Sequence, residues 1–154
     1  MARIISIVNQ KGGTGKSACA ANLGAGLARK NKKVLIVDAD LQSDVSASFG
    51  YRDCDDSDQT LTALMERSLR DQNIPEDCFI RNQQEGIDII CSNIELAGIE
   101  VQLVNAMSRE FILKQIINTV KDYYDYILID CIWNTMLRNA TNFMIWELMR
   151  KAQI

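Results

Sequence analysis

Short apolar runs alternate with longer segments of helical periodicity along this chain. Residues 34–37 are a run of valine, leucine and isoleucine, and residues 4–8 are isoleucine and valine apart from Ser6; polar residues bound both segments. Such runs favour strands that are buried on both faces of a parallel sheet. Residues 16–30, between them, are rich in alanine and leucine, with small residues where a helix packs closely on a sheet. The pattern therefore predicts a βαβ unit at the start of the chain.

The remaining patterns extend this α/β interpretation towards the C-terminus. Helices are expected over residues 43–49, 61–69, 95–105 and 109–120, and strands over residues 87–90 and 127–129. The acidic segment 50–58 is interpreted as a solvated loop, because its carboxylates lack the spacing of a calcium-binding loop. We find no internal repeat and no linker between two domains.

Composition narrows the possible classes of protein. The chain has 154 residues, 47% hydrophobic and 24% charged, which is typical of a single folded domain. A net charge of −3 gives no chain-wide basic surface for nucleic acid, although local patches stay possible. Histidine is absent, which excludes Ser-His and Cys-His nucleophile pairs and histidine metal ligands. The five cysteines form no CxxC pair, and no export signal or membrane span is found, so we expect reduced thiols and a cytoplasmic location.

The segment KGGTGKS, residues 11–17, joins the first predicted strand to the first predicted helix. Glycines allow backbone N–H groups to turn towards phosphate oxygens, and a helix N-terminus adds the positive end of its dipole. Lys16 can reach the β- and γ-phosphates, and the Ser17 hydroxyl can ligate Mg²⁺. The general pattern GxxxxGK[ST] is missed by one residue, because Gln10 occupies its first position. The alternative is a plain strand-to-helix turn.

The second lysine, Lys11, identifies this loop as the deviant Walker A motif KGGxGK[ST], and the chain here resembles the ParA/MinD superfamily of ATPases. Two further segments support the resemblance. VLIVDADLQSD, residues 34–44, resembles the family's second motif, which implies that Asp40 orients the attacking water and that Asp38 lies near the metal. YDYILID, residues 124–130, resembles the Walker B strand, which implies that Asp130 holds Mg²⁺ through water.

The resemblance implies a P-loop NTPase fold, with three layers (α/β/α) and a mainly parallel sheet. It implies ATP and Mg²⁺ as cofactors, bound by Lys11, Gly12, Gly13, Thr14, Gly15, Lys16, Ser17 and Ala18. The implied catalytic residues are Lys11, Lys16 and Asp40, and the implied metal site consists of Ser17, Asp38 and Asp130. Lys11 would act across an ATP-dependent homodimer. The expected partners are non-specific DNA and a ParB-like protein that stimulates hydrolysis; no membrane partner is expected.

The motif DADLQSD is nearer to the ParA branch of the superfamily than to the MinD branch. Residues 92–110 resemble a segment of ParA-like proteins from mobile elements. This segment is interpreted either as helix packing beneath the sheet or as part of a dimer face near the nucleotide, and no chemistry is assigned to it. The absence of paired cluster cysteines argues against the iron–sulfur branch.

The resemblance covers residues 4–131 and then stops. Ile132 and Trp133 stand where the family has small residues and a proline, and residues 132–154 resemble nothing in it. We therefore expect residues 1–131 to be the N-terminal part of a ParA-type ATPase domain, residues 132–154 to be a divergent helical tail, and the sheet to be truncated. The first strand would then become a sheet edge.

Two functions stay open at this point. One is a working ParA-type ATPase in DNA partitioning. The other is a truncated, non-catalytic fragment that binds nucleotide phosphates weakly or associates with a full-length homologue.

Overall fold

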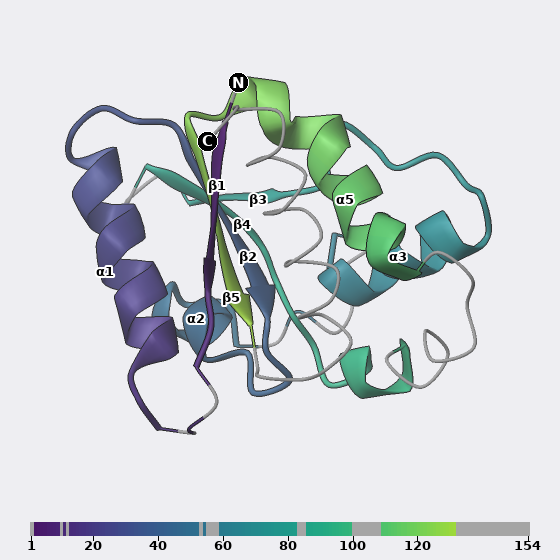
Figure 1. Cartoon of the computed structure of the whole chain (residues 1–154), viewed down its shortest axis with the longest axis horizontal. Coiled ribbons are helices and arrows are strands. Elements are labelled where there is room, and N and C mark those ends of the chain that lie inside the picture. Colours follow the sequence, from purple (N-terminus) through teal and green to yellow (C-terminus); the bar gives the residue numbers. More distant parts are fainter. Residues whose placement is uncertain are drawn as a thin grey trace.

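A computed structural model of the chain describes residues 2–9, 11, 13–52, 54, 59–82, 86–99 and 109–131 (Figure 1). The strands are β1 (Arg3–Ile7), β2 (Val34–Ala39), β3 (Ile80–Asn82), β4 (Ile87–Ile90) and β5 (Tyr126–Cys131). The helices are α1 (Lys16–Ala28), α2 (Asp44–Ser48), α3 (Leu61–Leu69), α5 (Arg109–Val120) and the 3-10 turn η1 (Lys121–Tyr123).

The five strands form one sheet in the order β1-β5-β2-β4-β3. Strands β1, β5, β2 and β4 are parallel, and β3 runs antiparallel to β4. The registers place Asp38 of β2 beside Asp130 of β5. Because the carboxyl ends of parallel strands meet at one edge of a sheet, the two predicted acidic positions and the loop after β1 lie at the same edge.

The helices cover both faces of the sheet, α1 on one and α3 with α5 on the other (Figure 1). The side chains of β2 show why this happens. Leu35 and Val37 belong to the apolar cluster that contains α3 and α5, whereas Val34 and Ile36 belong to the cluster around α1. The four consecutive apolar residues 34–37 are buried on both faces of the sheet, since successive side chains of a strand point to opposite sides. The three-layer α/β/α fold with a mainly parallel sheet is thereby confirmed.

Most predicted elements are present with shifts of a few residues, two elements were missed, and one prediction about burial needs correction. Strand β3 and the turn η1 were not predicted. The predicted first strand exists as β1, but the expectation that it is buried on both faces is wrong, because its residues are half-buried or exposed. Among the described strands β1 has only β5 as a neighbour, so it occupies an edge, as the truncated-sheet interpretation expected.

Several predictions lie outside the described residues. They concern Gln10, Gly12, most of the acidic loop, residues 100–108 of the segment after β4, and the tail 132–154. Within the described ranges, no helix is long and apolar enough to cross a membrane. All five cysteines are free thiols, four of them buried, and burial raises the pKa of Cys78 to about 11.

Candidate phosphate-binding site

The loop between β1 and α1 ends in a helix N-terminus that suits an anion. Gly15 is the N-cap of α1 and has a φ of +77°, a left-handed conformation that glycine adopts without strain. Its carbonyl accepts the N–H of Cys19 at 2.8 Å, which closes the first helical turn. The first N–H groups of an α-helix have no intrahelical partner, and no side chain caps this end. These amides can therefore donate to a phosphate.

Two hydrogen bonds between residues that are close in sequence shape the loop before the helix. The hydroxyl of Thr14 donates to the carbonyl of Lys11 at 3.1 Å, and the Lys11 N–H donates to Oδ1 of Asn9 at 3.1 Å. Gly13, with a φ of +68°, supplies the other left-handed position. The side chains of Asn9 and Thr14 thus hold the backbone of Lys11 from both sides.

A pocket of about 770 Å³ opens between this loop and the segment after β2. Its lining residues are Gly13, Thr14, Gly15, Lys16, Ser17, Ala18, Asp40, Leu41, Gln42, Asp44 and Ser48. This volume lies within the range of ligand pockets, roughly 300–1,000 Å³. The pocket has a basic and amide-rich wall on the loop side and an acidic wall opposite.

Asp130 lies fully buried one residue before the end of β5, and its carboxylate oxygens accept no hydrogen bond from the part of the chain that the structure describes. Burial raises the pKa of this carboxyl, and the nearby side chains of Ser17 and Lys16 act in the opposite direction. The carboxylates of Asp40 and Asp44 raise its pKa further. A buried carboxylate without partners is costly, which makes this position suitable for a cation.

The donor set fits Mg²⁺ shared with a phosphate. Among the described residues, no group of three or more His, Cys, Asp or Glu side chains could hold a metal ion alone. Mg²⁺ is commonly held by one or two carboxylates together with substrate phosphates. Asp130 and Ser17 supply one carboxylate and one hydroxyl next to the phosphate loop, which meets this requirement.

Asp38 is equally buried, but its carboxylate is fully engaged by the protein. Its Oδ1 accepts the N–H of Asp40 at 3.2 Å. Its Oδ2 accepts both the N–H of Ser46, at 2.9 Å, and the Ser46 hydroxyl, at 2.6 Å. Burial raises the pKa of Asp38 to about 6 in spite of these hydrogen bonds, which lower it.

Asp40 lies in the turn that follows β2 and borders the pocket. Its Oδ1 accepts the N–H of Gln42 at 2.9 Å, and its carbonyl accepts the N–H of Ser43 at 3.1 Å. Only 6% of the surface of Asp40 is exposed to solvent. A carboxylate that is fixed by its own turn and opens onto the phosphate loop suits the role of orienting a water.

The structure thus brings most predicted residues together. Residues 13–18 and Asp40 line the pocket, and Asp130 lies beside Ser17. Lys11 is exposed and does not line the pocket, and Gly12 lies outside the described residues. Asp44 ends the segment 34–44 that resembles the family's second motif, but no role was predicted for it. Ser46 and Ser48 carry no motif and reach the site through the fold of α2.

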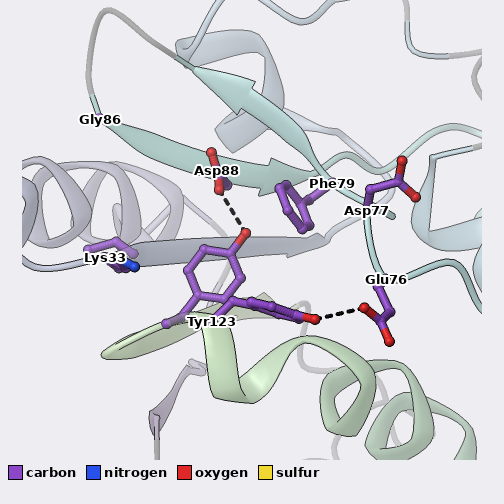
Figure 2. Close-up of a pocket in the computed structure, with 9 residues that line it drawn as sticks. Lys33, Glu76, Asp77, Phe79, Gly86, Asp88 and Tyr123 are labelled. Carbon is purple, nitrogen blue, oxygen red and sulfur yellow. Dashed lines mark hydrogen bonds between the residues drawn. The ribbon is translucent and has the colours of Figure 1, made fainter.

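A second pocket, of about 470 Å³, lies at the opposite end of the strands, where Lys33 and Val34 begin β2 (Figure 2). Two tyrosines that line this pocket are hydrogen-bonded to carboxylates that also line it. The hydroxyl of Tyr124 donates to Asp88 at 2.7 Å, and that of Tyr123 donates to Glu76 at 2.7 Å. This pocket contains no predicted site residue.

A central parallel sheet, a glycine loop leading into a helix N-terminus, and a lysine and a serine opposite a buried carboxylate define a P-loop nucleotide-binding protein. The chain belongs to the AAA domain family, whose pattern matches residues 2–145. The ParA branch suggested by the motifs is confirmed by its relatives.

The chain is similar to two curated proteins whose names refer to sporulation and to chromosome partitioning. The chain is 40% identical over 131 residues to the sporulation initiation inhibitor protein Soj of Bacillus subtilis, a match that covers 85% of this chain and 50% of Soj. It is 36% identical over 129 residues to the chromosome partitioning protein ParA of Myxococcus xanthus, covering 84% of this chain and 44% of ParA. The chain therefore spans about half the length of these relatives.

A solved structure supports the same fold. Cobyrinic acid a,c-diamide synthase from Mycobacterium smegmatis, crystallised with bound ADP and magnesium, superposes with a TM-score of 0.76 at 31% identity. The match covers 86% of this chain and 51% of the synthase.

Proposed function

We propose that this chain binds ATP with Mg²⁺ in the 770 Å³ pocket and is a Mg²⁺-dependent ATPase of the ParA type. The observation that carries the proposal is the fully buried Asp130 carboxylate, which accepts no hydrogen bond from the described residues and lies beside Ser17 and Lys16 of the phosphate loop. A bound cation would balance the charge of this buried carboxylate. The phosphate loop and the phosphates of the bound nucleotide would supply the remaining ligands of that cation.

The roles follow from the electrostatics of phosphoryl transfer, in which positioning and charge neutralisation do most of the catalysis. Lys16 and the amides of residues 13–18 would hold the β- and γ-phosphates. Ser17 and Asp130 would hold Mg²⁺, which when bound neutralises charge that develops on the phosphates. Asp40 would orient the attacking water. Asp38 would act near the metal by fixing the surrounding backbone, because its oxygens already accept three hydrogen bonds.

The biological role is proposed from the resemblance and the relatives. The Soj and ParA relatives, together with the DADLQSD motif, support a cytoplasmic partitioning protein rather than an amide-forming synthase, which shares the fold. Lys11 would reach the nucleotide of a second subunit in an ATP-dependent homodimer. Its exposure in the single chain is consistent with that role. Non-specific DNA and a ParB-like stimulator of hydrolysis are the proposed partners.

The second candidate is a non-catalytic chain that binds phosphates weakly or associates with a full-length homologue. It is favoured by one observation, the half-buried apolar edge strand β1. In both candidates residues 1–131 are proposed to form the N-terminal part of a ParA-type domain and residues 132–154 a divergent tail, although the family pattern extends to residue 145.

Titration of labelled ATP, with and without Mg²⁺, tests the proposal. Lys16→Ala should lose binding, and Lys32→Ala, an exposed lysine outside the pocket, should bind as the parent chain does. Turnover that disappears in Lys16→Ala supports the ATPase, whereas binding without turnover supports the non-catalytic candidate. An ATP affinity that Lys16→Ala leaves unchanged would refute the site itself.

A further inference from the structure

Ser46 is a completely buried polar residue that sequence reasoning did not identify. It lies in α2, eight positions after Asp38, and both its hydroxyl and its N–H donate to Oδ2 of that carboxylate, at 2.6 Å and 2.9 Å. Its hydroxyl oxygen also accepts the N–H of Ser92, beyond the end of β4, at 3.4 Å. Hydrogen bonds to an ionised acceptor are shorter and stronger than neutral ones, so the Ser46 bond to Asp38 is a firm attachment.

The Asp38 carboxylate consequently holds both ends of the segment 40–46. Oδ1 accepts the N–H of Asp40 at the start of the segment, and Oδ2 accepts Ser46 at its end. Between these points, the N–H of Gln42 donates to the side chain of Asp40. The segment is therefore a loop closed on a single buried side chain.

This loop forms the wall of the pocket that faces the phosphate loop. Asp44 and Ser48, on either side of Ser46 in α2, line the pocket, as do Asp40 and Gln42. Ser46 itself does not line it and is bonded instead to the strand ends behind. A displacement of Ser46 would move the pocket wall without removing any group that touches a ligand.

We propose that Ser46 is a positioning residue for ATP hydrolysis, whose hydroxyl ties the loop 40–46 to Asp38 and Ser92 and so sets where the Asp40 carboxylate lies. The inference rests on the proposed function, because it assigns Asp40 the task of orienting water. A small misplacement of a reacting group can cost about a hundredfold in rate, whereas ground-state binding through the phosphate loop should change little.

The test compares Ser46→Ala and Ser46→Cys with the control Ser68→Ala. Ser68 is also a buried serine, and its hydroxyl donates to Oε1 of Gln115 at 2.8 Å, between α3 and α5 and away from the pocket. The thiol of cysteine is larger than the serine hydroxyl and donates weakly, so Ser46→Cys weakens the bond to Asp38 without leaving a cavity if Ser46→Ala fails to fold. Circular dichroism verifies folding before each measurement.

Two quantities are measured on each folded variant. The first is ATP turnover, for which we expect Ser46→Ala to lower kcat by about tenfold or more with KM within about threefold, Ser46→Cys to lie between, and Ser68→Ala to match the parent chain. The second is amide hydrogen exchange over residues 40–46 without nucleotide, which should be faster in both Ser46 variants and unchanged in Ser68→Ala.

The two readouts separate failure of this inference from failure of the proposed function. Unchanged exchange over 40–46 overturns the positioning role whatever the turnover. Faster exchange with unchanged kcat overturns it as well, because the loop would then be loosened without consequence. If the parent chain has no ATP turnover, the proposed ATPase activity fails. Amide hydrogen exchange over residues 40–46 then still shows whether Ser46 holds this loop: faster exchange in the Ser46 variants means that it does, and unchanged exchange means that it does not.

Discussion

Asp38 and Asp130 are register partners on the adjacent parallel strands β2 and β5, and both side chains are completely buried. The negative charge of Asp130 contributes to the raised pKa of Asp38. The two carboxylates differ in their surroundings, since within the described ranges Asp38 accepts three hydrogen bonds and Asp130 accepts none. One carboxylate is therefore built into the protein, and the other is left for a ligand.

Burial of Asp38 predicts a pH-dependent stability of the protein without nucleotide or metal. The folded pKa of about 6 lies above the ordinary 3.8, so the folded state binds this proton more tightly than the unfolded state does. The resulting stabilisation is complete below pH 4 and is lost as the pH rises through 6. A shift of roughly two units corresponds to about 3 kcal/mol.

Urea denaturation of the parent chain and Asp38→Asn between pH 4.5 and 7.5 measures this contribution. We expect the free energy of unfolding of the parent chain to fall relative to the variant as the pH rises. Asp122→Asn, at an exposed carboxylate in η1, is the control variant for the loss of one aspartate outside the core. Parallel profiles for the parent chain and Asp38→Asn would contradict the prediction.

Replacement of Asp130 by asparagine should separate stability from metal binding. Asp130→Asn removes a buried charge that has no hydrogen bond, so it should stabilise the nucleotide-free protein at pH 7, by about 1 kcal/mol or more. The same change should abolish the additional stabilisation that Mg²⁺ gives in the presence of ATP. Thermal unfolding with ATP plus EDTA and with ATP plus Mg²⁺ tests both statements. An undiminished Mg²⁺ effect in the variant would remove Asp130 from the metal site.

The parts of the site that could be predicted from the sequence are those whose geometry is local. The loop KGGTGKS fixes its own left-handed glycines and the helix that follows, and a strand ending in Asp130 places that carboxylate at the end of the sheet. Ser46 could not be predicted, because its bond to Asp38 depends on how α2 packs against the strand ends. Strand β3 has only three residues, too few to show a period of two.

The burial of β1 shows a different limit of sequence patterns. A continuous apolar run indicates that both faces of a strand are covered, but it carries no information on how many strands flank it. Val34 of β2 and Ile5 of β1 belong to similar runs, yet Val34 is 1% exposed and lies between two strands, whereas Ile5 is half-buried beside one.

Replacement of Asp40 should affect ATP turnover, whereas replacement of Lys11 should affect the association of two subunits. Asp40→Asn keeps an oxygen that can accept the N–H of Gln42, so ATP binding should be nearly unchanged, while turnover should fall by about a hundredfold or more because a charge that orients water is lost. Lys11→Ala should bind ATP but lose ATP-dependent association, as seen by light scattering. Equal loss of ATP binding in the two variants would show that these roles are wrong.

Two glycines of α1 provide a matched test of how closely this helix packs on the sheet. A Cβ at Gly24 would lie 2.9 Å from Cδ1 of the buried Ile36, whereas a Cβ at Gly26 would meet nothing within 4 Å. Gly26→Ala should therefore raise the free energy of unfolding by about 0.5–1 kcal/mol through helix propensity. Gly24→Ala should raise it by less, because the terminal methyl of Ile36 must move to make room for the added Cβ. Urea denaturation measures the free energy of unfolding of both variants. Equal changes in Gly24→Ala and Gly26→Ala would contradict the close packing of α1 on Ile36.

The edge strand β1 predicts self-association of the chain with or without nucleotide. Its apolar side chains are only half-buried, on both faces of the sheet, and β5 is its only partner among the described strands. The N–H of Arg3 donates to the carbonyl of Asp125, and backbone groups alternate along a strand, so the N–H groups of Ile4 and Ser6 point away from β5. Donors of this kind on an apolar edge recruit further strands.

Proline substitutions on β1 can test this edge directly. Ser6→Pro removes a donor that points outward and leaves the ladder to β5 intact, so it should reduce self-association without unfolding the protein. Ile5→Pro removes a donor that points to β5 and should destabilise the fold instead. Size-exclusion chromatography with light scattering, with and without ATP and Mg²⁺, measures the association. A monodisperse monomer of the parent chain in both conditions would mean that the edge of β1 is covered, and Ser6→Pro should then disrupt that cover and lower the stability.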